Sequence, residues 1–376
     1  MSKALREENS GKTAAAYRPV HLGPRDFLLD RKPDGTIYIR SPHKLGAYPD
    51  KITERLVYWA KSAPDRTFMA QRNAAGEWRK ISYAETLQKV RAIGEWLLPR
   101  DLSPERPIAI LSGNSIEHAL MGLAAIYIGV PYVPVSPAYS LISEDFGKLR
   151  HIFELLTPGL VFADDGKVFG RAIEKVVPPD LEIVVAHNPV VGRICALFKP
   201  LTEIEATAAV DEAHAKVGPD TIAKILFTSG STGLPKGVIN TQRMWCSNQE
   251  MIAAQLRFFR EDPPVIVDWS PWHHTAGGNH NVGFIIYNGG TLYIDEGKPL
   301  PGAIETTVKN LRDVACNWFF TVPKGYEALL PFFRADAELR KVFFTSSRCC
   351  GLRVRLSGNP CSTRCRSLRS RRSVSA

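Results

Sequence analysis

Short β-rich runs alternate with helical stretches from about residue 105 onward, and this alternation limits the folds that the chain can adopt. Strand, helix and strand repeated on this scale form parallel sheets whose faces are covered by helices. We therefore predict an α/β protein with helix-covered, mostly parallel sheets. The predicted strands are PIAIL (107–111), LVFAD (160–164), LEIVVA (181–186), AKILFT (223–228), PVIVDW (264–269), TLYID (291–295) and NWFFTV (317–322).

The clearest predicted helix follows Asn114. Asn114 and Glu117 have the spacing of a helix capping box, and Gly129 supplies a stop signal. Between these signals, apolar residues recur at helical spacing, at Ile116, Leu120, Leu123 and Tyr127.

The first part of the chain has weaker periodicity. Residues 1–50 are rich in turn signals, and we predict an irregular N-terminal segment with a short hairpin as the alternative for residues 31–50. A helix is predicted to begin near Ile52, with Leu56, Trp59 and Ala60 on one face.

Neither a membrane span nor a secretory signal is predicted. The longest apolar run, LMGLAAIYIGV at 120–130, is much shorter than the roughly 18 residues that a spanning helix needs. The first twenty residues carry charges of both signs and lack the apolar segment of a signal peptide. Within residues 1–339 the cysteines Cys195, Cys246 and Cys316 are scattered singly, as in reduced cytosolic proteins. We predict a cytoplasmic protein.

The net charge of +10 comes from the end of the chain. Ten Lys and Arg residues lie from Arg340 to Ala376 without any Asp or Glu, so residues 1–339 are neutral. Arg and Ser make up half of residues 345–376, where large apolar residues are scarce. Such a segment buries too little apolar surface to offset the entropy lost on ordering. We predict a disordered Arg/Ser/Cys-rich tail over residues 345–376.

The stretch ILFTSGSTGLPKGV, residues 225–238, predicts a strand followed by a phosphate-binding loop. Glycines permit close backbone approach, hydroxyls and N–H groups can converge on anionic oxygens, and Lys236 adds a positive charge. The spacing differs from the common P-loop, because Lys236 precedes Gly237 and not Ser or Thr. A flexible linker is disfavoured because the stretch lies inside the β/α alternation. The loop residues are Thr228, Ser229, Gly230, Ser231, Thr232 and Gly233.

The same stretch resembles the phosphate-loop signature of the AMP-forming adenylating superfamily of acyl-CoA and aryl-CoA ligases, luciferases and peptide-synthetase adenylation domains. A second stretch, WSPWHHTAGGNHNVGFIIYNGGTLYIDEGKP (269–299), is similar to the region of that superfamily that holds a Pro-x-x-His element. The sequence around this element, together with residues 52–85, looks closest to that of feruloyl-CoA synthetases. The resemblance covers roughly residues 20–345 and implies that residues 51–344 are part of the large N-terminal AMP-binding domain.

This resemblance implies a ligase that uses ATP, Mg²⁺ and coenzyme A. The carboxylate of an aromatic or other small acid attacks the α-phosphate to give an acyl-adenylate and pyrophosphate, and the CoA thiol then displaces AMP. By the same resemblance, the loop from Thr228 to Lys236 holds the β- and γ-phosphates, and His274 lies beside the carboxylate. The implied substrate pocket consists of Trp272, Gly277, Gly278 and Asn279, with a core role as the alternative for Trp272.

No protein metal site is predicted. Three histidines, His273, His274 and His280, lie close together in the sequence, but no Cys or carboxylate cluster accompanies them. Adjacent histidines point in different directions, and zinc sites rarely use this spacing.

The resemblance ends near Phe344. The family's Tyr-Gly-x-Thr-Glu element, its ribose-binding aspartate and its small C-terminal domain with a lysine have no counterpart in residues 345–376, so we expect a truncated or frameshifted ligase. Two alternatives stay open. One is an inert fragment with at most weak nucleotide binding. The other is a nucleic-acid or membrane binder acting through the charges of Arg348–Arg372, although we expect no nucleic-acid partner because charge runs are usually only solvated.

Overall fold

The computed structural model describes residues 19–228, 233–347 and 349–352. The chain divides into two compact units. The larger unit is Leu22–Asp295, and the smaller joins Met1–His21 to Glu296–Ala376.

The larger unit contains a seven-stranded sheet with the order β11-β10-β6-β5-β7-β8-β9. Every neighbouring pair is parallel except β10 and β11, which form an antiparallel hairpin. The strands are β5 (Ile108–Leu111), β6 (Tyr132–Pro134), β7 (Leu160–Asp165), β8 (Ile183–His187), β9 (Cys195–Leu197), β10 (Ile222–Thr228) and β11 (Lys236–Thr241).

A second sheet of the larger unit has four strands in the order β12-β13-β3-β4, of which only β3 and β4 pair antiparallel. The predicted fold class, an α/β protein with mostly parallel sheets, is confirmed. These strands are β3 (Thr67–Arg72), β4 (Trp78–Ser82), β12 (Val265–Asp268) and β13 (Thr291–Ile294).

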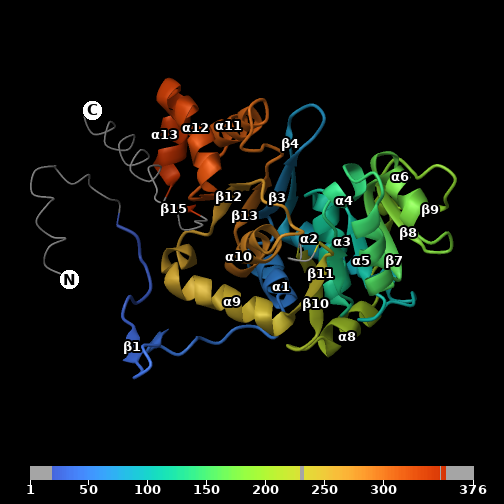
Figure 1. Cartoon of the computed structure of the whole chain (residues 1–376), viewed down its shortest axis with the longest axis horizontal. Coiled ribbons are helices and arrows are strands. Elements are labelled where there is room, and N and C mark those ends of the chain that lie inside the picture. The colour runs from blue at the N-terminus through green and yellow to red at the C-terminus, as the bar shows by residue number, and fades with distance from the viewer. Residues whose placement is uncertain (1–18, 229–232, 348, 353–376) are drawn as a thin grey trace, which may run out of the picture. The chain divides into compact units, whose positions relative to one another are not determined.

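Helices cover both faces of the seven-stranded sheet. Helices α5 (Gly147–Leu156) and α6 (Gly166–Val176) bury their apolar sides against the strands on one face. Figure 1 shows α2 (Tyr83–Leu97) and α3 (Ile116–Tyr127) between β3 and β4 of one sheet and β7 and β8 of the other. Because α3 contacts both sheets, every one of its residues is buried, which explains its nearly continuous apolar sequence.

The described part of the larger unit contains eight further helices, including one 3₁₀-helix (η1) and one π-helix (η2). No helix among the described residues is long and apolar enough to cross a membrane. The remaining helices are α1 (Thr53–Ser62), α4 (Ala138–Leu141), α7 (Phe198–Leu201), α8 (Ala208–Lys216), α9 (Gln242–Gln255), η1 (Arg257–Arg260), η2 (Ala276–Asn281) and α10 (Val282–Asn288).

The predicted helix after Asn114 is present, but its cap differs from the prediction. Ser115 is the N-cap, and its side chain accepts a hydrogen bond from the backbone N–H of His118. The side chain of Asn114 instead bonds the backbone of Ser270 and Trp272. A tertiary contact therefore takes the residue that the local pattern assigned to the cap. The helix ends as predicted before Gly129, which has φ of +86°.

The N-terminal part of the larger unit contains a short hairpin, the alternative that we gave for residues 31–50, but its first strand begins earlier, at Leu28. Strands β1 (Leu28–Arg31) and β2 (Ile37–Arg40) pair antiparallel. The helix predicted near Ile52 is α1, which buries Leu56.

The described part of the smaller unit consists of three helices and two parallel strands. They are α11 (Ile304–Asp313), α12 (Pro323–Ala335), α13 (Ala337–Ser346), β14 (Trp318–Thr321) and β15 (Cys349–Leu352). The tail therefore differs from the prediction at its start, because α13 extends to Ser346 and β15 follows. An Asp336 cap begins α13, and the uncharged sequence CCGL pairs its backbone with β14. The rest of the predicted tail, residues 353–376, lies outside the described residues.

Candidate functional site

The predicted phosphate loop connects the two antiparallel strands β10 and β11. Thr228 ends β10 opposite Lys236, the first residue of β11, and the Thr228 hydroxyl donates to the Lys236 carbonyl at 3.4 Å. Both residues are exposed, as is Gly233, whose φ of +98° lies in the left-handed region. The predicted residues Ser229, Gly230, Ser231 and Thr232 lie outside the described residues.

The Pro-x-x-His segment follows β12 and leads into the π-helix η2. Its two predicted pocket glycines are buried where backbone passes very close to them. A Cβ on Gly277 would lie 2.4 Å from the carbonyl oxygens of Ser270 and Pro271, and a Cβ on Gly278 would lie 2.2 Å from that of Trp272. Only glycine therefore fits at these two positions. A π-helical turn such as η2 is frequent at functional sites.

The structure brings the β10–β11 hairpin, which carries the first motif, into direct contact with the second motif. The Asn279 amide of η2 donates to the Asn240 side chain of β11 at 2.8 Å. The Lys224 amine of β10 donates to the Gly278 carbonyl at 2.9 Å. The hairpin that carries the phosphate loop is thus hydrogen-bonded to the segment predicted to line the acid pocket.

Lys224 is the most unusual side chain of this region, and sequence reasoning missed it. It is fully buried, and its Nζ lies 3.3 Å from the centroid of the Trp245 ring and 5.5 Å from that of Tyr132. Burial removes water from the ammonium group and holds the pKa of Lys224 well below its ordinary value of 10.5. Lys224 is therefore a structural donor inside the protein and not a surface cation.

Helix α9 also supports η2. The indole N–H of Trp245 and the side-chain amide of Gln249 both donate to the Asn279 carbonyl, each at 2.9 Å. Neither residue was a candidate, because nothing in the local sequence indicates that α9 packs on η2.

The predicted pocket residue Trp272 lies in the core, with 4% of its surface exposed. Its ring packs edge-on against His118 of α3, with 5.0 Å between ring centroids. The Nδ1 of His118 donates to the Gly113 carbonyl at 2.8 Å, and burial lowers the pKa of His118 to about 4. His118 is therefore a neutral core residue at physiological pH.

The three neighbouring histidines have different surroundings. His274 is exposed, and its Nδ1 accepts a hydrogen bond from the Ala276 backbone N–H at 3.3 Å. Burial lowers the pKa of His273 to about 4, and His280 shares a 2.7 Å hydrogen bond with the Asn281 side chain. Within residues 19–228 and 233–347, no three His, Cys, Asp or Glu side chains form a group that could hold a metal ion.

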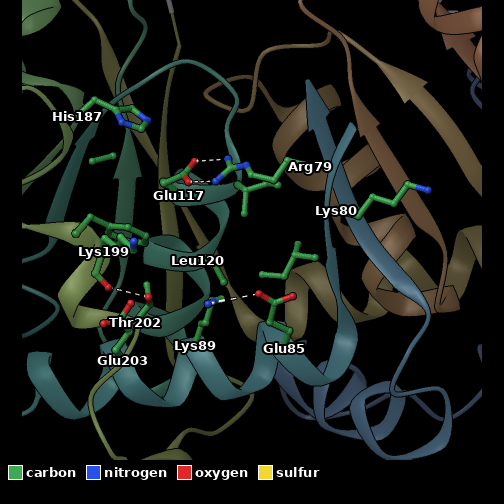
Figure 2. Close-up of a pocket in the computed structure, with 14 residues that line it drawn as sticks. Arg79, Lys80, Glu85, Lys89, Glu117, Leu120, His187, Lys199, Thr202 and Glu203 are labelled. Carbon is green, nitrogen blue, oxygen red and sulfur yellow. Dashed lines mark hydrogen bonds and ion pairs between the residues drawn. The ribbon is translucent and has the colours of Figure 1, made fainter. Parts of the chain in front are cut away.

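A separate cavity of about 360 Å³ lies between β4, α2, α3, β8 and α7. Figure 2 shows Arg79 and Glu117 facing each other across two hydrogen bonds. Below them, Lys89 and Glu85 of α2 form an ion pair with 3.4 Å between Nζ and Oε1. None of the residues that we predicted for the site is among those lining this cavity. The cavity is therefore distinct from the contact between the two motifs.

The sequence profile of the AMP-binding enzyme family matches residues 56–369 of this chain. The chain belongs to this family. The match runs beyond residue 345, where we expected the resemblance to end. The matching relatives include acyl-CoA and aryl-CoA ligases, so the coarser part of the sequence prediction, the AMP-forming ligase family, is confirmed.

Individual relatives of this chain are distant. A methyl-dioxo-octahydro-indenyl propanoyl:CoA ligase of Rhodococcus jostii is 25% identical over 57% of this chain and 42% of its own length. The 4-chlorobenzoate–CoA ligase of a Pseudomonas strain is 26% identical over 46% of this chain and 30% of its own length. The chain thus spans less than half the length of these relatives. The solved structure of VinN with L-aspartate superposes with a TM-score of 0.65 at 20% identity, covering 85% of this chain and 73% of VinN, and supports the fold.

Proposed function

We propose that this chain carries the phosphate-binding side of an ATP-dependent, AMP-forming carboxylate–CoA ligase of the feruloyl-CoA synthetase type. The observation that carries the proposal is the direct hydrogen bonding between the β10–β11 hairpin and η2. These bonds join Lys224 and Asn240 of the hairpin to Gly278 and Asn279, and they support a site shared by the hairpin and the segment of His274. A nucleotide and a carboxylate bound at these two elements would be neighbours, as adenylation requires.

Two chemical steps follow from this proposal. A carboxylate oxygen of the acid attacks the α-phosphorus of ATP, and the bond to the pyrophosphate leaving group breaks. The thiol of coenzyme A, after losing its proton, then attacks the acyl carbon, and AMP leaves. Negative charge accumulates on phosphate oxygens in the first step, so the protein contributes mainly positioning and electrostatic stabilisation.

The residues have separate proposed roles in this reaction. Lys236, exposed at the start of β11, would pair with the β- and γ-phosphates together with Thr228 and the loop that follows it. His274, exposed on the neighbouring segment, would contact the carboxylate. We assign Mg²⁺ to the phosphates of ATP, since the described residues hold no cluster suited to bind it alone.

The acid is proposed to be aromatic on the basis of sequence resemblance. Trp272 is buried, which gives its ring a packing role against His118. Asn279 is likewise held by α9 and β11. We therefore propose that Trp272, Gly277, Gly278 and Asn279 shape the acid pocket through their backbone positions.

Lys236→Ala is expected to lower acid-dependent pyrophosphate release by about a hundredfold, because one charged stabiliser of the phosphate oxygens is lost. ATP affinity, measured by titration calorimetry, is expected to fall as well. Lys216→Ala removes another exposed lysine, at the end of α8, and is expected to change neither quantity. Equal ATP affinity in the two variants would contradict the role of Lys236.

A further inference from the structure

The hairpin of β1 and β2 presents an apolar surface to solvent. All eight of its strand residues are exposed, including Leu28, Leu29, Ile37, Tyr38 and Ile39, with exposed fractions from 44% to 67%. Figure 1 shows this hairpin at the end of an extended arm (blue). Exposed apolar groups concentrated in this way mark an interaction surface.

The arm is fastened at its base and open at its tip. The Gly23 N–H donates to the Gln255 carbonyl at 2.8 Å, and Gly46 packs against the Glu250 side chain. Between these points, the exposed side chains of His43 and Asp26 share a hydrogen bond of 2.9 Å. Among the described residues no third strand pairs with the hairpin, and an isolated two-stranded sheet is marginally stable in water. Pairing with another strand would therefore stabilise the hairpin.

The register of the hairpin identifies which backbone groups are available. Lys32 donates to the Thr36 carbonyl at 2.9 Å, and the pairing continues through Asp30 opposite Tyr38. Hydrogen-bonded pairs alternate with non-bonded pairs in an antiparallel ladder. Counting from the bonded pair Lys32–Thr36, the pair Asp30–Tyr38 is also bonded, and the positions of Ile37 and Ile39 are non-bonded. The N–H and C=O groups of Ile37 and Ile39 therefore point away from β1, toward the open edge of β2.

The open edge of β2 is complementary to itself. If two copies pair antiparallel about a two-fold axis at Tyr38, Ile37 of one copy lies opposite Ile39 of the other, and their outward groups can exchange hydrogen bonds. The two Tyr38 side chains then form the close, non-hydrogen-bonded pair on the axis. Arg40 lies opposite Thr36 of the second copy, so this register opposes no like charges.

The open edge of β1 is less suitable. The backbone groups on this edge that point away from β2 belong to Leu29 and Arg31. If two copies pair Leu29 with Arg31, Asp30 lies opposite Asp30. If they pair about Arg31, Arg31 lies opposite Arg31. A third register opposes Leu28 to Asp30. Like charges directly opposite are unfavourable in a sheet, and the third register sets a carboxylate against an apolar side chain that offers it no hydrogen bond.

We propose that the chain forms a two-fold symmetric dimer through β2, giving a four-stranded sheet with the order β1-β2-β2-β1. An isologous interface of this kind closes on itself, because the same edge is used by both copies. Pairing removes the open edge of β2 from solvent and covers the Tyr38 and isoleucine side chains beside it. The proposal is independent of nucleotide binding.

Sedimentation velocity over a concentration series tests the proposal on the full chain. Ile39→Pro deletes an N–H that points away from β1 and should leave the hairpin's own bonds in place. Two intermolecular hydrogen bonds are lost per dimer, so the dissociation constant is expected to rise at least about tenfold. Leu29→Pro is the matched control, because it deletes an outward N–H and an exposed apolar side chain on β1. It is expected to leave the dimer intact.

The register is tested by oxidative cross-linking. Tyr38→Cys places two thiols directly across the axis and is expected to give a covalent dimer in high yield, whereas Asp34→Cys, at the turn, is not. A wild-type chain that stays monomeric over the whole series would overturn the proposal. Equal weakening by Ile39→Pro and Leu29→Pro, or cross-linking of both cysteine variants alike, would overturn the assignment to β2.

Discussion

Replacing Gly278 with alanine is expected to destabilise the larger unit by about 3 kcal/mol, which is the upper part of the range for overpacked interiors. The added Cβ would lie 2.2 Å from the Trp272 carbonyl oxygen, and its three nearest atoms all belong to the Trp272 backbone. Backbone cannot rotate away as a flexible side chain can. The π-helix η2 must therefore shift, and the bond from Lys224 to the Gly278 carbonyl is expected to break.

Thermal unfolding measures this effect. Gly278→Ala is expected to lower the unfolding midpoint by roughly 5–10 °C. Gly170→Ala is the matched control, because Gly170 lies within α6 and an added Cβ there meets no atom within 4 Å. That variant is expected to gain about 0.5–1 kcal/mol of stability. Equal midpoints for the two variants would contradict the close backbone approach at η2.

Replacing Lys224 with methionine is expected to change how stability depends on pH. The folded protein holds the pKa of Lys224 well below 10.5, whereas the unfolded chain restores it to about 10.4. Between these two values the unfolded state binds more protons, so Lys224 makes the free energy of unfolding rise with pH. The slope from this one group is at most about 1.4 kcal/mol per pH unit. Lys224→Met removes it.

Urea unfolding at several pH values between neutrality and pH 10 tests this prediction. The wild-type midpoint is expected to rise more steeply with pH than the Lys224→Met midpoint. Lys216→Met replaces an exposed lysine and is expected to keep the wild-type slope. If the wild type and Lys224→Met gave parallel curves, Lys224 would titrate alike in the folded and unfolded states, and its buried, neutral role would be wrong.

Much of the fold could be predicted because buried strands have a local signature. The seven predicted strands all occur within a residue or two of their predicted ends, since runs of apolar and β-branched residues form strands buried by helices. Strand β6 (Tyr132–Pro134) was not predicted, because three residues ending in proline carry too little pattern. The cap at Ser115 in place of Asn114 shows the same limit, since either residue can cap a helix.

The site was predictable as two motifs but not as one arrangement. The phosphate loop and the Pro-x-x-His segment were recognised separately, while their connection through Lys224 and Asn240 was not. A lysine within a strand normally reaches solvent, and only the tertiary packing of Trp245 over it reveals its burial. Trp272 illustrates the converse, because an aromatic residue beside a motif is placed in the core by its contact with α3.

Pyrophosphate release measures whether this chain holds ATP where a carboxylate can attack it, as we propose. Purified chain is incubated with ATP and Mg²⁺, with and without ferulate, and pyrophosphate is measured before coenzyme A is added. We expect release that requires ferulate and that Lys236→Ala reduces by about a hundredfold. A folded wild-type chain that releases no pyrophosphate in response to ferulate or any other small carboxylic acid would contradict the claim.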